Sequence, residues 1–417
     1  MIADQFLNEI IFRNLLSQTI SMKRTLLLIS GLLILLATEI LRVYFIMPFP
    51  GSQKTNTIDI AYFLNNYIWL FRILGLILFV PPMLYIFRHS KWWKKILLGI
   101  FVLLYGAVFY MFNFKFLADK MFIQPQHKIL TTAAANKIDS NKLIIGVFMN
   151  GQAKAYPIEV IGYHHQVQDT VGGEPVMVTY CSVCRTGRVF SPIVNGKFEK
   201  FRLVGMDHFN AMFEDATTKS WWRQVTGIAI AGPLKGSTLK ELPSEQMRLG
   251  AWINKYPNTL IMQPDAVFVK QYKGLEGFDE GTINSGLEKR DSGSWQFKSW
   301  VVGVAKDGNA KAYDWNELVK QRIINDTFQN MPLVLVLEND NRSFHVWNRQ
   351  VNDKLLNFTF DAVTQTLKDA ATSSVWNMNG ECIEGELKGS KLSVIQSYQE
   401  FWHSWQSFHP GTVTYKN

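Results

Sequence analysis

The fold is decided by a sequence that occurs twice, as LIIGVFMNGQAKAYPIEVIGYHHQVQDT (143–170) and as WVVGVAKDGNAKAYDWNELVKQRIINDT (300–327), which align without a gap. The likeness continues farther along, where GIAIAGPLKGSTL (227–239) aligns with GECIEGELKGSKL (380–392) and AWINKYPNTL (251–260) with SWQSFHPGTV (404–413). Self-similarity of this kind indicates an internal repeat. Residues kept in both copies are expected to serve the shared fold, and residues present in one copy only are candidates for function.

Short strands dominate the pattern of both copies. Segments such as LIIGVFM and EPVMVTY are rich in β-branched and aromatic residues, and Asn150-Gly151 is a hairpin turn signal. Helices are expected from about Ile158 through the two histidines, over about 244–256, and around 397–408. The sequence therefore predicts an α+β, mostly β domain over 121–417, made of repeat one (about 143–265), a connector (266–298) and repeat two (about 299–417).

Two tryptophan pairs support this division. Trp222 aligns with Trp376 and Trp252 with Trp405, so we predict that all four are packed in the core rather than used in binding.

Three apolar runs precede the repeats, at about 25–46, 67–87 and 96–117. Each reaches the ~20 residues that a helix needs to cross a bilayer. A cleavable signal peptide is the alternative for the first run, but two further runs follow it. Residues 1–120 are therefore expected to be a transmembrane region with the lipid bilayer as partner.

The charges flanking these runs predict their orientation. The loop 88–95 holds four basic residues and no acidic one, whereas the preceding loop offers only Lys54 against Asp59. Loops rich in Lys and Arg stay in the cytoplasm. We expect a multi-pass protein of the bacterial cytoplasmic membrane, with its N-terminus inside and the domain after about residue 120 extracytoplasmic.

The basic net charge of +9 belongs to this membrane region. Residues 1–120 hold 12 of the 43 Lys and Arg but only 5 of the 34 Asp and Glu, which leaves the large domain almost neutral. Nucleic acid is therefore not an expected partner.

The first copy alone contains a Cys-x-x-C, Cys181-Ser182-Val183-Cys184. It follows one predicted strand and precedes another, so both thiols are expected at the tip of a hairpin. In thioredoxin-like enzymes the motif instead opens a helix, whereas a strand-turn-strand setting is typical of metal knuckles.

The candidate partners of these cysteines are also confined to the first copy. The second copy has no Cys, His or Met where the first has the following residues: Cys181, Cys184, His164, His165, Met206 and His208. Such joint loss is expected of one cooperative site. Thiolate, imidazole and thioether ligands suit copper or zinc. We predict a metal site, copper ahead of zinc, formed by Cys181, Cys184 and His164 with His208 or Met206 as a further ligand.

Other interpretations of the cysteine pair stay open. The two thiols are alternatively a redox-active dithiol or a structural disulfide. A redox-active dithiol makes the protein a thiol-disulfide redox protein. A cysteine pair that only stabilises the hairpin makes it a non-enzymatic metal-binding or assembly module. A metal site with an open position is compatible with oxidation or with metal-assisted hydrolysis. The sequence does not determine whether the protein is an enzyme.

Three motifs resemble a bacterial family catalogued as domain of unknown function 3179: TVGGEPVMVTYCSVC (170–184), TGIAIAGPLKGSTLKELP (226–243) and YPNTLIMQPD (256–265). The resemblance spans about 143–415. It implies a fold but no established reaction.

The resemblance also implies which polar positions recur in the family. They are His164, Cys181, Cys184, Arg185 and Asn210. We predict that Arg185, Asn210 and His165 orient a substrate or support the ligands. Arg185 is alternatively structural, because the second copy keeps it as Arg342. This chain departs from the family where His165 replaces an acidic residue and Ser182 replaces proline, so a glutamate-like base is not expected here.

Overall fold

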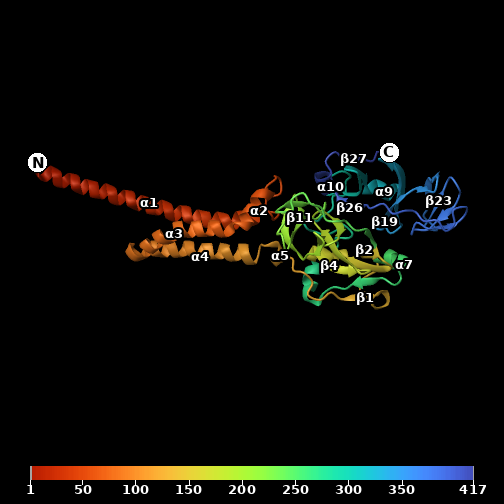
Figure 1. The fold of residues 1–417 in the computed structure, drawn as a ribbon, viewed down its shortest axis with the longest axis horizontal. Helices are drawn as coiled ribbons and strands as arrows, with labels where there is room; N and C mark the ends of the chain where they lie inside the picture. The colour runs from red at the N-terminus through yellow and green to blue at the C-terminus, as the bar shows by residue number, and fades with distance from the viewer. Residues whose placement is uncertain (1, 417) are drawn as a thin grey trace. The chain divides into compact units, whose positions relative to one another are not determined.

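The computed structural model describes residues 2–416 (Figure 1). Two compact units make up the chain. The first consists of residues up to Met121 together with Val204–Met206, and the second of Phe122–Leu203 with the residues from Asp207 onward. The first unit is helical and the second is rich in sheet, as the sequence predicts.

The helical unit consists of α1 (Ile2–Tyr44), α2 (Ile58–Asn66), α3 (Ile68–His89), α4 (Trp92–Phe114) and α5 (Ala118–Met121). Three segments are long and apolar enough to cross a membrane: Ser21–Tyr44, Ile68–His89 and Trp92–Phe114. Helices α1, α3 and α4 run side by side (Figure 1). The three predicted apolar helices are therefore confirmed to within a few residues.

A polar cluster ties these three helices together near one end. Glu39 of α1 is fully buried, and Arg72 of α3 donates from Nε and Nη2 to its two carboxylate oxygens at 2.6 and 2.9 Å. Asn113 of α4 donates to Glu39 at 2.8 Å and accepts from Arg42 at 2.7 Å. The charged residues of this region thus pair with one another across the helices, as buried charges must.

The sheet-rich unit begins with a five-stranded sheet of order β1-β14-β3-β2-β13. Its strands are β1 (Leu130–Thr132), β14 (Leu260–Met262), β3 (Gln152–Pro157), β2 (Leu143–Met149) and β13 (Glu245–Arg248). Strands β2 and β3 form an antiparallel hairpin, and β14 joins β3 in parallel. Helix α6 (Ile158–His164) follows β3 and leads into the three-stranded sheet β4 (Gln166–Val171), β5 (Glu174–Cys181) and β6 (Thr186–Phe190).

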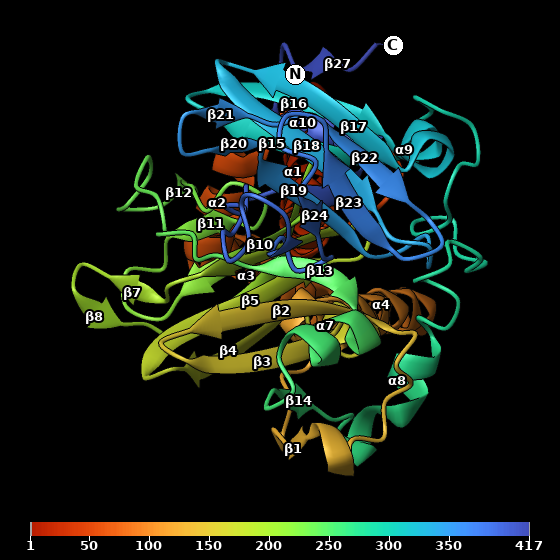
Figure 2. The same ribbon diagram turned by 90° about the vertical axis from the view of Figure 1, so that its right-hand side faces the viewer.

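The second half of the unit, drawn in blue in Figure 2, repeats the pairing of β13, β2, β3 and β14 but has no counterpart of the edge strand β1. A four-stranded sheet has the order β26 (Tyr398–Phe401), β15 (Trp300–Lys306), β16 (Asn309–Asp314) and β27 (Val413–Thr414), again with a parallel pair at β16 and β27. Helix α9 (Trp315–Gln321) leads into the sheet β17 (Ile323–Phe328), β18 (Met331–Leu337) and β19 (Phe344–Asn348). Descent of both halves from one duplicated segment stays a prediction.

Each half also has a four-stranded meander and a small two-stranded sheet. The meanders are β9 (Phe201–Asp207), β10 (Asn210–Asp215), β11 (Trp221–Arg223) and β12 (Ala229–Ala231), and β22 (Phe358–Asp361), β23 (Thr366–Asp369), β24 (Val375–Trp376) and β25 (Cys382–Glu384). The small sheets are β7 (Ile193–Val194) with β8 (Lys197–Phe198), and β20 (Gln350–Val351) with β21 (Lys354–Leu355).

Buried tryptophans fill equivalent places in the two halves, which confirms their predicted core role. Trp252 packs on Gly146, where an added Cβ would lie 2.4 Å from the ring, and Trp405 packs on Gly303, where that distance is 2.2 Å. Trp222 and Trp376 donate their indole N–H groups to Asp215 and Asp369.

The helices predicted near 244–256 and 397–408 are present, but the predicted start of each is wrong, because a strand precedes the helix. Residues Glu245–Arg248 form β13 and only Leu249–Lys255 form helix α7. Likewise, β26 precedes helix α10 (Trp402–Phe408). Pairing of these strands with β2 and β15 overrides the local helical pattern. The glycine-rich connector 266–298 is expected from its sequence to be extended, but it contains the short helices η2 (Ala266–Phe268) and α8 (Val269–Lys273). A further short helix, η1 (Ala133–Ala135), lies before β2.

Candidate functional site

The Cys-x-x-C lies at the tip of the β5–β6 hairpin, which confirms the predicted setting. Cys181 ends β5 and pairs in register with Thr186, the first residue of β6. Between them Arg185 adopts a left-handed backbone conformation, with φ of 55°, and its N–H donates to Ser182 O at 3.2 Å. This tight turn directs both cysteine side chains into the protein.

Both thiols converge on one backbone oxygen. The Sγ atoms of Cys181 and Cys184 lie 3.5 and 3.3 Å from the carbonyl oxygen of Phe209, and both cysteines are fully buried and free. Phe209 belongs to the two-residue turn between β9 and β10, in which His208 and Phe209 have φ values of 49° and 67°. Left-handed conformations at two residues other than glycine are strained and frequently accompany functional sites.

Residues from far along the chain complete the surroundings of the motif. Lys298 is buried, and its Nζ donates to Val183 O at 2.6 Å. Nε2 of His403 lies 3.2 Å from the same oxygen, so this ring nitrogen carries the proton. The backbone N–H of Phe401 donates to Cys184 O at 2.9 Å. The site therefore combines the first half of the domain with the connector and with the end of the second half.

The two thiols have unequal acidities. Burial raises the pKa of Cys181, but hydrogen bonds from the Cys184 thiol and from the N–H groups of Ala211 and Cys184, with the charge of Lys298, outweigh it and leave that pKa lowered. Burial and the interaction with Cys181 both raise the pKa of Cys184. Cys181 is therefore the more acidic of the two thiols.

The pKa values of Lys298 and His403 are also shifted. Burial lowers the pKa of Lys298, against the attraction of Cys184 and Cys181. Burial, followed by the charge of Lys298, lowers the pKa of His403 to about 3. His403 is therefore a neutral side chain that stacks on Phe297, with the ring centroids 4.3 Å apart.

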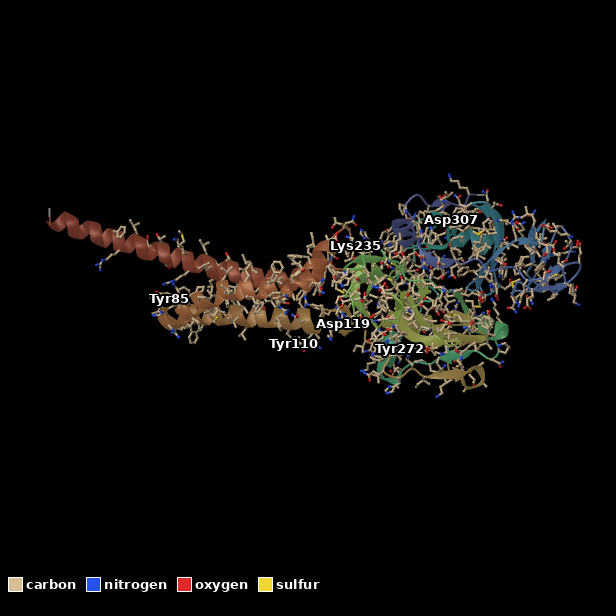
Figure 3. All side chains as sticks on the ribbon, viewed as in Figure 1. Tyr85, Tyr110, Asp119, Lys235, Tyr272 and Asp307 are labelled. Carbon is tan, nitrogen blue, oxygen red and sulfur yellow. The ribbon has the colours of Figure 1, made fainter. Side chains whose placement is uncertain are left out.

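The predicted ligand His164 has partners at both ring nitrogens. Nδ1 lies 2.5 Å from Ile123 O, and Nε2 lies 2.7 Å from the hydroxyl of Tyr272, which is labelled in Figure 3. His165 is buried, and its Nδ1 lies 3.0 Å from Tyr180 O. These hydrogen bonds give both histidines a structural role at the end of α6.

The other two predicted ligands lie on the β9–β10 hairpin. Met206 is buried on β9, whereas His208 is partly exposed and its Nδ1 lies 2.6 Å from Asp207 Oδ1. Asp207 also pairs with Arg223. Within residues 2–416 there is no group of three or more His, Cys, Asp or Glu side chains arranged to hold a metal ion. The structure therefore brings together Cys181 and Cys184 but not the full predicted ligand set, and metal binding stays a prediction.

Arg185 and Asn210 support the site through buried hydrogen bonds. Arg185 lies over the ring of Trp300 at 3.7 Å and donates to Gln399 Oε1 at 2.9 Å and to Phe278 O at 2.9 Å. Asn210 donates to Gln224 Oε1 at 2.9 Å, which joins the β9–β10 hairpin to the segment after β11. Both side chains hold the elements around the cysteines in place.

Sequence reasoning missed Lys298 and His403. Lys298 belongs to SWQFKSW (294–300), where a single lysine stands among aromatic residues, and such a lone charge in an apolar stretch is the available signal. His403 lies in FWHSW (401–405), where the same signal applies.

Comparison with known proteins identifies one matching family. The model of a family described as "Protein of unknown function (DUF3179)" matches residues 123–412. No curated protein and no solved structure matches the chain significantly.

Proposed function

Because the chain belongs to the DUF3179 family of proteins of unknown function, which supplies no reaction, we propose a function from the site itself: Cys181 and Cys184 are a redox-active dithiol in a membrane-anchored domain. The observation that carries the proposal is the contact of both free thiols with one carbonyl oxygen, next to the buried ammonium of Lys298. In the described part of the chain Lys298 forms no ion pair with a carboxylate. Cys184 and Cys181 act on its charge more strongly than the carboxylates of Glu288 and Asp291, so a thiolate is the counter-charge that we assign to it.

The asymmetry of the two thiols suits thiol-disulfide exchange. The Cys181 thiolate attacks one sulfur of a substrate disulfide, which forms a mixed disulfide and expels the first substrate thiolate. Cys184 then loses its proton and attacks the Cys181 sulfur, which forms the Cys181–Cys184 disulfide and releases the second thiolate. Two electrons pass from the dithiol to the substrate disulfide. The proton lost by Cys184 ends on one released thiolate, and the other released thiolate takes its proton from water. The substrate class is a disulfide.

Access to the buried thiols requires movement of their cover. Phe209 lies in the strained turn directly against the sulfurs, and Phe297, which is 58% exposed, stacks on His403 beside them. Opening of the β9–β10 turn releases the strain of its two left-handed residues. The covering turn thus protects the thiolate from nonspecific oxidation while leaving a route to it.

A second candidate function is Cu(I) binding, which the charges of Cys181, Cys184 and Lys298 favour. Two thiolates carry two negative charges, which are balanced by one Cu(I) ion together with the Lys298 ammonium. Zinc requires four ligands, and a divalent ion beside Lys298 leaves a buried excess of positive charge. Soft thiolates select Cu(I), which accepts two sulfur ligands. Copper remains ahead of zinc on these grounds.

Thiol titration of the full-length protein in detergent distinguishes the candidates. The protein is equilibrated in buffers of reduced and oxidised dithiothreitol, and free thiols are counted after denaturation. A redox-active dithiol predicts the reversible loss of two thiols per chain, which is abolished in Cys181→Ser and in Cys184→Ser. Cys382→Ser is the matched control, because Cys382 is the third buried free cysteine and lies in the other half. Failure of the two thiols to oxidise reversibly overturns the redox proposal.

A parallel Cu(I) titration against a chromogenic chelator tests the second candidate. One equivalent bound by wild type and Cys382→Ser, but not by Cys181→Ser, supports copper binding. Affinity unchanged by Cys181→Ser overturns it.

We also propose that the domain is extracytoplasmic on the bacterial cytoplasmic membrane, with the N-terminus inside. The basic loop 88–95 supports this orientation. An alkaline phosphatase fusion after residue 120 is expected to be active, and a fusion within the loop 88–95 inactive. The opposite pattern contradicts the orientation.

A further inference from the structure

A pocket of about 520 Å³ opens between helices α1, α3 and α4. It lies at the end of the helical unit where α3 ends and α4 begins, near Tyr85 (Figure 3) and away from the polar cluster of Glu39. Its volume falls within the ~300–1,000 Å³ range of small-ligand sites. The pocket has no part in the chemistry proposed for the cysteines.

One side of the pocket is cationic and hydroxylated. Arg24 of α1 and Lys94 of α4 line it, together with the hydroxyl residues Ser21 and Ser90. The Arg24 guanidinium lies 3.7 Å from the centroid of the Tyr85 ring, which orients it. The stretch 68–117, which includes α3 and α4, contains no Asp or Glu at all. These two cations thus have no carboxylate partner among the described residues.

The other side of the pocket is apolar and faces outward. Leu28, Leu97 and Phe101 line it. Leu97 and Phe101 are 45% and 39% exposed, and both lie on α4, which is apolar enough to lie in hydrocarbon. A ligand held here by its charge can continue along this wall. The pocket therefore matches an amphiphile with an anionic head better than a soluble anion.

We propose that this pocket binds an anionic phospholipid of the surrounding leaflet. The lipid phosphate accepts hydrogen bonds from Arg24 and Lys94, with Ser21 and Ser90 as further donors, and an acyl chain packs along Leu97 and Phe101. Basic pockets between transmembrane helices on the cytoplasmic side recognise anionic head groups in this manner. A bound lipid fills the pocket and supplies the negative charge that Arg24 and Lys94 lack.

Native mass spectrometry of the full-length protein in detergent tests the proposal. The protein is titrated with phosphatidylglycerol, with phosphatidylcholine as the zwitterionic probe. The first bound phosphatidylglycerol is expected to be held at least about tenfold more tightly than phosphatidylcholine. The double variant Arg24→Gln/Lys94→Gln is expected to lose about tenfold or more of that affinity, because it removes both charged hydrogen-bond donors to the phosphate.

The matched control is Lys91→Gln/Lys95→Gln, which removes two charges from the same loop region but from residues that do not line the pocket. It is expected to change the affinity by less than about threefold. An equal loss in both double variants means general surface attraction and overturns the proposal, as does equal binding of the two lipids. Competition by inorganic phosphate at millimolar concentration likewise overturns it in favour of a free-anion site. Far-ultraviolet circular dichroism checks that both variants stay folded.

Discussion

Lys298 donates from its ammonium group to the carbonyl oxygen of Val183 at 2.6 Å. This contact joins residues 115 positions apart and fixes a buried positive charge on the turn between the two cysteines. Both thiols interact electrostatically with Lys298, as do the carboxylates of Glu288 and Asp291. The electrostatics of the motif therefore depend on a residue outside the hairpin that carries it. Each consequence for the thiols is open to direct measurement.

Replacement of Lys298 by Met is expected to raise the pKa of Cys181 by about one unit, because the charge of Lys298 lowers that pKa and a nearby opposite charge typically shifts a pKa by about that much. The thiolate absorbance near 240 nm, followed against pH in Cys184→Ser and in Cys184→Ser/Lys298→Met, reports this value. Lys289→Gln is the control, since Lys289 is an exposed lysine of the same connector. An unchanged thiolate titration would show that Lys298 does not act on Cys181.

The buried carboxyl of Asp279 makes stability fall as pH rises. Burial raises its pKa from 3.8 to about 7, against the N–H of Leu143, which donates to Oδ2 at 2.7 Å, and the charge of Arg185. The folded state therefore holds a proton that the unfolded state releases between pH about 4 and about 7. The stabilisation is present at low pH and is lost across that window.

Asp279→Asn removes this titration, so it is expected to gain stability relative to wild type as pH rises from 4.5 to 8, by at most about 4 kcal/mol. Chemical unfolding at both pH values measures the difference. Glu280→Gln, at the exposed neighbouring residue, is expected to show no comparable gain. A difference between Asp279→Asn and wild type that is constant with pH would refute the assignment.

His403 produces the opposite pH dependence. Burial lowers its pKa from 6.5 to about 3. Between these two pH values the unfolded state therefore binds a proton at this residue and the folded state does not. Stability is therefore lost as pH falls from about 6.5 toward 3. His403→Gln keeps an N–H donor for Val183 O and is expected to reduce the loss at pH 5 by at most about 2 kcal/mol.

His208 is the contrasting case for the same experiment. Its hydrogen bond to Asp207 raises its pKa, so its stabilisation is present at acidic pH and is lost as pH rises through the raised pKa. His208→Gln is therefore expected to be destabilised most at low pH, with the difference from wild type shrinking as pH rises. Equal slopes for wild type, His208→Gln and His403→Gln would contradict both assignments.

The sequence predicts the parts of this fold that local pattern controls. The apolar runs gave the membrane-length helices, and the strands flanking Cys181 and Cys184 placed the pair at a hairpin tip because both strands are adjacent in the chain. Pairing of residues 245–248 with β2 was not predicted, because it depends on a partner about 100 residues away. Local helical propensity gave the wrong element there.

The site itself depends on contacts between distant residues. Lys298 and His403 contact Val183 from 115 and 220 residues away, and no spacing rule relates them. His164 shows the converse. Its type and position suited a metal ligand, but the sequence could not reveal that Ile123 and Tyr272 would occupy both of its ring nitrogens. Residue type suggests the chemistry that a side chain offers, whereas tertiary contacts decide whether it is used.

The helical unit provides the last prediction, through the pair formed by Glu39 and Arg72. Glu39 is fully buried and Arg72 donates to both of its carboxylate oxygens, so Arg72→Gln leaves a buried charge without its main partner. Loss of one partner of a buried pair costs about 3–5 kcal/mol, whereas removal of both charges costs much less. Thermal unfolding of the full-length protein in detergent is expected to show a large decrease for Arg72→Gln and partial recovery in Glu39→Gln/Arg72→Gln. Arg88→Gln, at an exposed residue in the last turn of α3, is the control. If the double variant is no more stable than Arg72→Gln, the pair does not hold the three helices together through charge.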